Sequence, residues 1–171
     1  GKGNFINVDE FLMTSKVNIW AIGDAIGRQM FTHAGDKEAE IAWNNATTNS
    51  KLRMEFDKVP HAVFTNPQIA SIGLTESEAK KSYRIIVGKA NYSDIVQGDA
   101  RMEEDGFAKA IVDKDTRKIL GFHLIGPEAP ELIQEVVNAV ANEMTIDSIA
   151  KTMHIFPSLS ELIPEVLGNL Q

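Results

Sequence analysis

The sequence of 171 residues contains no cysteine. Without cysteine the chain can form neither a disulfide scaffold nor a thiolate metal site, and such a composition is typical of a cytoplasmic protein. Its four histidines lack the spacing expected of metal ligands, so we predict no metal site. Gly-x-Gly-x-x-Gly and Walker-type loops are also absent, which excludes the usual glycine-rich cradle for a dinucleotide pyrophosphate.

Two further absences concern the partners of the protein. The net charge is −7, and no basic cluster is present that would neutralise phosphates, so we predict no nucleic-acid partner. No apolar run approaches the roughly 18 residues that span a bilayer, and no signal-peptide pattern begins at Gly1, so we predict no membrane partner. The hydrophobic content of 43% is that of a globular protein with a sizeable core.

An apolar run from Val17 to Ile22 ends at Gly23-Asp24. The run predicts a strand that is buried on both faces. A glycine at its end lets another group approach the backbone, and an aspartate there places a carboxylate where α/β sheets usually bind ligands. The neighbouring hydroxyls of a ribose or ribityl chain suit such an acceptor. The alternative is a turn in which the acid is solvated or caps a helix.

The rest of the N-terminal part predicts one strand and one helix. Within the opening segment, Phe5, Ile6 and Val8 suggest a short strand. From Thr32 to Asn49 the pattern is helical, with Trp43 packed near its middle and a stripe at three- and four-residue spacing formed by Ala34, Glu38, Ile41, Ala42 and Ala46. The charged stretch 51–58 marks a boundary, so we divide the chain into residues 1–58 and 59–171.

Residues 59–171 predict an α+β domain, an antiparallel sheet with flanking helices. Extended segments are expected at 62–65, 69–73, 84–88, 107–112 and 119–125, the last two as a β-hairpin. Thr75 and Thr145 are expected to cap short helices, and an apolar stripe predicts a longer helix from about Glu131 to Met144. Ser158 and Glu161 have the spacing of a capping box at the head of a final helix.

Three motifs occur in order along the chain: Ile-Trp-Ala-Ile-Gly-Asp at 19–24, Phe-Thr-Asn-Pro-Gln-Ile-Ala-Ser-Ile-Gly-Leu-Thr-Glu at 64–76, and Pro-Ser-Leu-Ser-Glu at 157–161. Together they resemble the C-terminal part of the flavin-dependent pyridine nucleotide-disulfide oxidoreductases, closest to dihydrolipoamide dehydrogenase. The resemblance implies that residues 1–58 are the C-terminal remnant of an FAD-binding domain and that residues 59–171 are a dimerisation domain.

The resemblance also assigns cofactor residues. It makes Asp24, which follows Gly23, the carboxylate that holds the ribityl hydroxyls of FAD, and it places Met30, Phe31, Thr32 and His33 at the start of a helix whose amides approach the flavin ring. A helix N-terminus suits this role because its N–H groups and dipole stabilise negative charge. For His33 we prefer a structural role at the helix start to a catalytic one. FAD and NAD(P) are then held mainly by an upstream part.

The C-terminal segment departs from the family pattern. Dihydrolipoamide dehydrogenases carry His-Pro-x-x-x-Glu there, in which the histidine is the acid/base and the glutamate orients it. Glu161 is in place, but Phe156 occupies the histidine position and transfers no proton. His154, two residues earlier, is the candidate substitute. The alternatives are that Glu161 only completes a capping box, and that the chain resembles mercuric reductase or transhydrogenase, which lack the histidine.

The implied activity passes electrons between NAD(P)H, FAD and a dithiol/disulfide. The resemblance further implies a homodimer with the dithiol/disulfide substrate at the subunit interface, and a chain that is inactive by itself. A rival hypothesis from another class is a standalone dimerisation module without redox chemistry, which the absent cysteine and glycine loops also fit.

Overall fold

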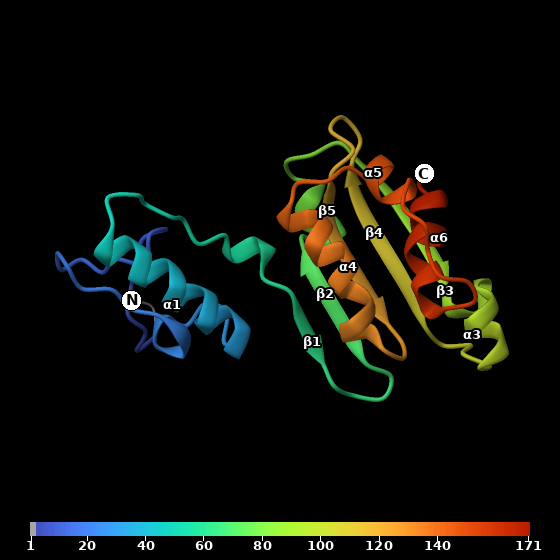
Figure 1. Ribbon diagram of the computed structural model, residues 1–171, viewed down its shortest axis with the longest axis horizontal. Helices are drawn as coiled ribbons and strands as arrows, with labels where there is room; N and C mark the ends of the chain where they lie inside the picture. Colours follow the sequence, from blue (N-terminus) through green and yellow to red (C-terminus); the bar gives the residue numbers. More distant parts are fainter. Residues whose placement is uncertain (1–2) are drawn as a thin grey trace. The chain divides into compact units, whose positions relative to one another are not determined.

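A computed structural model describes residues 3–171 of the chain. The chain divides into two compact units, one that ends at Val59 and one that runs from Pro60 to Gln171 (Figure 1). We describe each unit by itself.

The first unit is built around one long helix, α1 (Thr32–Thr47), as the sequence predicts. Two short 3-10 helices, η1 (Gly23–Ile26) and η2 (Phe56–Lys58), lie before and after it in the chain. Its buried apolar core consists of Leu12, Ile26, Ile41 and Met54. The side chain of the buried Asn45 of α1 accepts from the Leu52 amide and donates to the Phe11 and Leu52 carbonyls. It therefore satisfies backbone groups of segments that precede and follow the helix in the chain.

The predicted strand from Val17 to Ile22 is wrong. The Val17 side chain is 79% exposed and Ile19 is 54% exposed. Pairing is confined to an isolated bridge between Met13 and Trp20 within a local turn. A strand needs a continuous partner for its backbone groups, and the described part of this unit offers only a few residues for that purpose.

Two smaller predictions in this unit are also wrong. The expected strand at Phe5, Ile6 and Val8 reduces to one bridge between Val8 and Thr14. Trp43 is 73% exposed rather than packed, because it follows the buried Ile41 by two positions and therefore faces away from the core side of α1.

The second unit is an antiparallel sheet of five strands in the order β1-β2-β5-β4-β3. This confirms the α+β fold, an antiparallel sheet with flanking helices. The bounds are β1 His61–Val63, β2 Ile69–Gly73, β3 Ile85–Asn91, β4 Phe107–Asp113 and β5 Ile119–Ile125. The predicted hairpin is confirmed as β4 and β5, and Asp113 accepts from the Thr116 hydroxyl in its turn.

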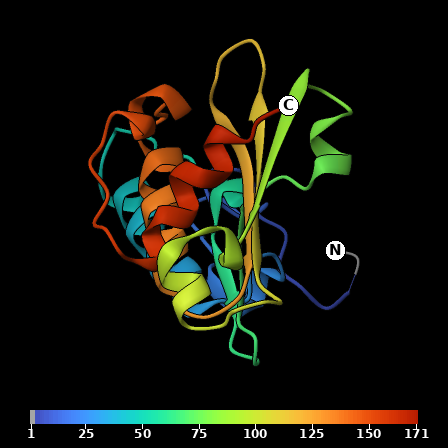
Figure 2. The same ribbon diagram turned by 90° about the vertical axis from the view of Figure 1, so that its right-hand side faces the viewer.

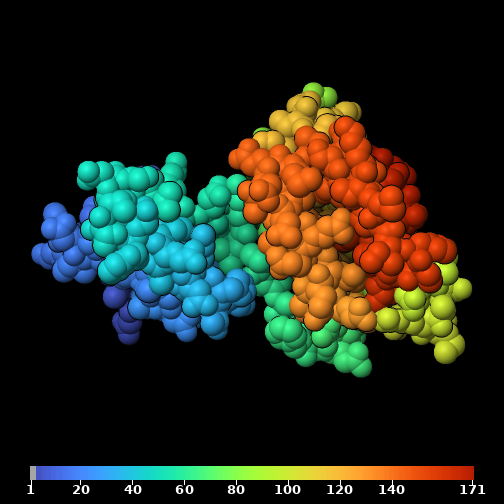
Figure 3. Space-filling view, viewed as in Figure 1, coloured from blue at the N-terminus to red at the C-terminus, as the bar shows by residue number. Residues whose placement is uncertain are grey.

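Helices cover both sides of this sheet. They are α2 (Glu76–Ala79), η3 (Tyr92–Asp94), α3 (Val96–Ala100), α4 (Ala129–Ala141), α5 (Ile146–Ala150), η4 (Leu159–Glu161) and α6 (Leu162–Gly168). Figure 2 shows α4 and α6 on one side and α2 on the other. The space-filling view in Figure 3 shows α4 in orange and the C-terminal residues in red on one face of this unit. The predicted helix caps at Thr75, Thr145 and Ser158 are confirmed, since each side chain accepts a backbone amide of its own helix.

Small residues dominate the side of the sheet beneath α4 and α6. One row across the five strands contains Ala62, Ala70, Leu124, Ala108 and Ala90. In the adjacent row Phe122 lies between Ile72 and Ala110, and Gly88 follows on β3. A Cβ on Gly88 would lie 2.2 Å from the Val166 carbonyl oxygen of α6, so only glycine allows this helix to pack so closely.

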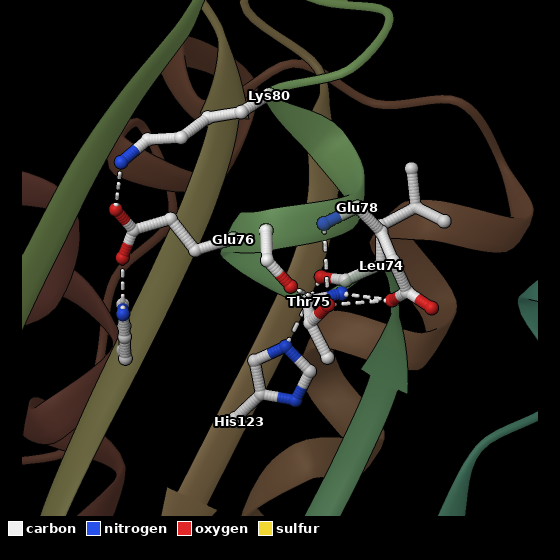
Figure 4. Close-up of polar contacts among 8 residues, drawn as sticks. Leu74, Thr75, Glu76, Glu78, Lys80 and His123 are labelled. Carbon is white, nitrogen blue, oxygen red and sulfur yellow. Dashed lines mark hydrogen bonds and ion pairs between the residues drawn. The ribbon is translucent and has the colours of Figure 1, made fainter.

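The opposite side of the sheet is polar around α2 (Figure 4). Glu76 pairs with Lys109 of β4 and with Lys80, and these two ammonium groups lower the pKa of Glu76 to about 2. Glu78 completes the capping box of Thr75. Nε2 of His123 on β5 lies 3.1 Å from the Leu74 carbonyl oxygen, and burial lowers the pKa of His123.

One acid lies inside the first unit. The Glu38 side chain on α1 is 0% exposed, and its Oε2 accepts a hydrogen bond from the Gly23 amide. Burial raises the pKa of Glu38 above its ordinary value of 4.5, the Gly23 hydrogen bond opposes this, and the nearby negative charge of Asp24 adds to the rise. The protonated form of Glu38 is therefore favoured by folding.

The raised pKa predicts how the stability of this unit depends on pH. Stabilisation by protonated Glu38 is complete below pH 4.5 and is lost as the pH rises through the raised pKa of the folded state. We expect the Tm of the wild-type chain to fall relative to that of Glu38→Gln as the pH rises above 4.5 and through the raised pKa. Tryptophan fluorescence measures it, because Trp20 and Trp43 both lie in this unit. The exposed Glu40→Gln is the control, and a pH-independent difference would contradict the raised pKa.

Candidate functional site

The predicted ligand aspartate lies in a tight turn of the first unit. Gly23 has a φ of +65°, which favours glycine, and it opens the 3-10 helix that contains Asp24. The Gly27 amide donates to the Asp24 carbonyl at 3.1 Å and closes the turn. The Asp24 side chain is exposed. The turn geometry of our alternative interpretation is therefore present, and it presents the carboxylate outward.

Space around Gly23 is open on one side and closed on the other. A Cβ added to Gly23 would meet nothing within 4 Å. On the closed side, α1 approaches so near that a Cβ on Gly35 would lie 3.7 Å from the Gly23 Cα. The turn and the first part of α1 are thus direct neighbours, with room left for a ligand group beside the glycine.

The second predicted element, residues 30–33, forms the beginning of α1. Phe31 is the N-cap in an extended conformation, and its own side chain makes no capping hydrogen bond. Met30 is 52% exposed. The rings of Phe31 and His33 are stacked with centroids 5.5 Å apart and planes at 10°, a contact that supports the structural role preferred for His33. Thr32 is the first helical residue, so its turn carries the positive end of the helix dipole.

These features fit the group that the resemblance implies. An exposed carboxylate accepts hydrogen bonds from vicinal hydroxyls, a glycine without a Cβ leaves room beside it, and the N-terminus of a 16-residue helix stabilises negative charge. The chemistry of Gly23, Asp24 and residues 30–33 is therefore compatible with a ribityl chain and an electron-accepting ring.

The C-terminal candidates lie in the second unit and have different partners. Nε2 of His154 is 2.8 Å from Oε1 of Glu135 on α4, and the His154 side chain is only 12% exposed. Glu161 Oε1 instead accepts from the Ser158 amide at 2.7 Å. No hydrogen bond joins His154 to Glu161 among the contacts of residues 3–171. The capping-box interpretation of Glu161 thus describes its hydrogen bonding.

Phe156 occupies an open position in this segment. Its side chain is 69% exposed, and it precedes Pro157 through a cis peptide bond. Met153 and Ile155 beside it are 97% and 77% exposed. The segment between α5 and η4 therefore presents three apolar side chains to its surroundings, with His154 turned inward toward α4.

Sequence reasoning missed two glutamates of these sites. Glu38 carried a signal, since it is a charged residue in the buried stripe between Ala34 and Ile41. Glu135 carried none that we recognise, because it lies 19 residues from His154 on a separate helix. Only the packing of the C-terminal segment onto α4 brings them together.

Residues 3–171 contain neither a cluster of metal ligands nor a membrane-spanning helix. No group of three or more His, Asp or Glu side chains is arranged to hold a metal ion. None of the helices formed by these residues is long and apolar enough to cross a membrane.

Comparisons with known proteins show the family to which the chain belongs. Residues 59–167 match the family model described as pyridine nucleotide-disulphide oxidoreductase, dimerisation domain. Dihydrolipoyl dehydrogenase 3 of Haloarcula marismortui is 34% identical over 166 residues, which are 96% of this chain and 35% of that protein.

Two solved structures share the fold. LpdA of Mycobacterium tuberculosis has a TM-score of 0.91 at 27% identity, covering 98% of this chain and 37% of that one. The HOCl-induced flavoprotein disulfide reductase RclA of Escherichia coli has a TM-score of 0.85 at 26% identity, with 98% and 39% covered. The chain thus spans little more than a third of the proteins that it matches, and it belongs to the pyridine nucleotide-disulphide oxidoreductase family.

Proposed function

We propose that this chain is the FAD-contacting and dimerisation part of a flavin-dependent disulfide oxidoreductase resembling dihydrolipoamide dehydrogenase. The whole enzyme would pass electrons between NAD(P)H, FAD and a dithiol/disulfide. The observation that carries the proposal is the adjacency of the Gly23-Asp24 turn and the first turns of α1 in a chain of this family. Residues 1–58 would supply flavin contacts, and residues 59–171 would supply the subunit interface.

Different residues of the first unit would bind different parts of FAD. Asp24 would accept hydrogen bonds from ribityl hydroxyls, beside the open face of Gly23. The first turn of α1, from Thr32, would stabilise negative charge through its amides and dipole. FAD supplies two-electron redox chemistry when bound. The glycine-rich loops for FAD and NAD(P) pyrophosphates would come from outside this chain, which contains none.

The flavin role of Asp24 predicts a loss of cofactor. In the flavoenzyme that contains this chain, we expect Asp24→Asn to raise the Kd for FAD by about tenfold or more, because charge-assisted hydrogen bonds to hydroxyls are weakened. Fluorescence titration of the apoenzyme with FAD measures the Kd. Asp57→Asn, at an exposed acid of the same unit, is the control. An Asp24→Asn enzyme with unchanged FAD affinity would refute the assignment.

The interface role is supported by the apolar segment between α5 and η4. Exposed apolar residues that are scattered singly are ordinary on a surface, whereas a contiguous group marks an interaction site. Met153, Ile155 and Phe156 are such a group. We therefore propose that a second copy of the subunit covers them, with the dithiol/disulfide substrate bound nearby at the interface.

If the chain dimerises, its molar mass in solution should be that of a dimer and should not change with concentration in the micromolar range. We expect sedimentation equilibrium to give a dimer for the wild-type chain and a monomer for Ile155→Asp, because a buried unpaired charge at an interface is strongly unfavourable. Met102→Asp, at an isolated exposed methionine, should remain a dimer. A monomeric wild-type chain would contradict the proposed dimerisation. A dimer of the complete protein that binds no FAD would favour the standalone module.

His154 is the proposed acid/base in place of the missing histidine. Glu135 on Nε2 would fix the orientation of the ring, leaving Nδ1 for proton exchange with a thiol. Glu161 would act indirectly, by capping the helix that follows the segment. The alternative is an enzyme of the mercuric reductase or transhydrogenase kind, which the exposed Phe156 favours because it has no proton to transfer.

The two alternatives predict different kinetics in the flavoenzyme. If His154 is the acid/base, His154→Gln should lower kcat for dithiol oxidation by about 100-fold or more and remove one limb of its pH profile. Glu135→Gln should lower kcat by less than His154→Gln does, because the ring loses the carboxylate that orients it but keeps its nitrogens. If the enzyme lacks this step, His154→Gln should leave kcat within about threefold, and Phe156→His should raise it, since general acid-base catalysis would be added.

A further inference from the structure

The buried Glu38 has no part in the function proposed above. It lies on the second turn of α1, its side chain is 0% exposed, and Oε1 has no hydrogen-bond partner among residues 3–171. A hydrophobic side chain of similar volume would fill this place without the desolvation penalty of a carboxyl group. The stability of the unit alone therefore does not explain why an acid is found here.

The contact that Glu38 makes is with the turn that presents Asp24. Its Oε2 accepts the Gly23 amide hydrogen at an N···O distance of 2.5 Å. Gly23 is the first residue of η1, and Ile22, the residue in the N-cap position, has no side-chain hydrogen bond to offer it. A carboxylate from α1 thus caps a helix that lies 15 residues earlier in the chain.

A second residue of α1 lies close to the same glycine. Gly35 lies one helical turn before Glu38 and on the same side of the helix, and a Cβ added to Gly35 would be 3.7 Å from the Gly23 Cα. The helix backbone thus approaches Gly23 closely, and the Glu38 hydrogen bond holds Gly23 at this place. Asp24 follows directly, so this packing and this hydrogen bond set its distance from the beginning of α1.

We propose that Glu38 is a positioning residue of the flavin site, which fixes the spacing between Asp24 and the N-terminus of α1 through its hydrogen bond to Gly23. Both flavin-contacting elements then move as one body. This inference rests on the proposed function, because the spacing matters only if Asp24 and α1 contact the same cofactor.

The test compares variants of the flavoenzyme that contains this chain. Glu38→Leu keeps the volume and removes the acceptor, and we expect it to raise the Kd for FAD by about tenfold. Glu38→Gln keeps an oxygen that accepts from Gly23, so its Kd should stay within about threefold of the wild type. Glu40→Gln, an exposed acid of α1 paired with Lys37, should change nothing. Asp24→Asn serves as the reference for the flavin site itself.

A second readout needs no flavin. In the 171-residue chain, the amide proton of Gly23 should resonate downfield and exchange slowly with solvent, because it donates a short hydrogen bond to a buried carboxyl oxygen. Glu38→Leu should abolish both features, and Glu38→Gln should retain the protection. Tryptophan fluorescence shows whether each variant is folded. If Glu38→Leu does not fold, the protection of the Gly23 amide in the unmodified chain and in Glu38→Gln still tests the hydrogen bond on which the positioning role depends.

Each outcome gives a decision. A raised Kd in Glu38→Leu, with near-normal binding in Glu38→Gln, supports the positioning role. If Asp24→Asn raises the Kd but Glu38→Leu does not, the positioning role is overturned and the flavin site stands. If Asp24→Asn itself has no effect, the proposed flavin site fails and this inference fails with it. An unprotected Gly23 amide in the unmodified chain overturns the positioning role directly.

Discussion

The close packing of α6 on the sheet is the constraint on which the second unit depends. At Gly88 the Val166 carbonyl of α6 comes within 2.2 Å of the place where a Cβ would stand. The alanines of the neighbouring strands extend this low surface, and α4 lies on the same side (Figure 2). Gln171 then exchanges both backbone hydrogen bonds with Val87, so the chain end pairs with the outer edge of β3 and protects it.

The segment that joins α5 to η4 is fixed at its two ends, because Ile149 and Leu159 on either side of it are buried in the core. Between them, His154 is attached to Glu135 of α4, while Met153 and Phe156 remain exposed. The segment therefore combines one inward polar contact with an apolar outer surface, an arrangement that is compatible with the proposed interface between two subunits.

The sequence predicted those parts of the structure that local physical chemistry determines. The hairpin of β4 and β5, the caps at Thr75 and Ser158, and α1 each follow from spacing or turn chemistry within a few residues. The prediction of a buried strand at Val17 is wrong, because apolar content leads to burial only when a partner surface exists. The contacts of Glu38 with Gly23 and of Glu135 with His154 join separate elements, so no local pattern could reveal them.

The two acids near Gly23 differ in environment, and this difference separates their roles. Asp24 is exposed to solvent, whereas Glu38 is enclosed in the unit. Burial raises the pKa of Glu38, and the negative charge of Asp24 adds to the rise, so folding favours the protonated form of the buried acid. Asp24 presents its carboxyl group where ligand hydroxyls would meet it, and Glu38 retains an oxygen for the Gly23 amide in either protonation state. One carboxyl group can thus hold the turn while the other presents the charge.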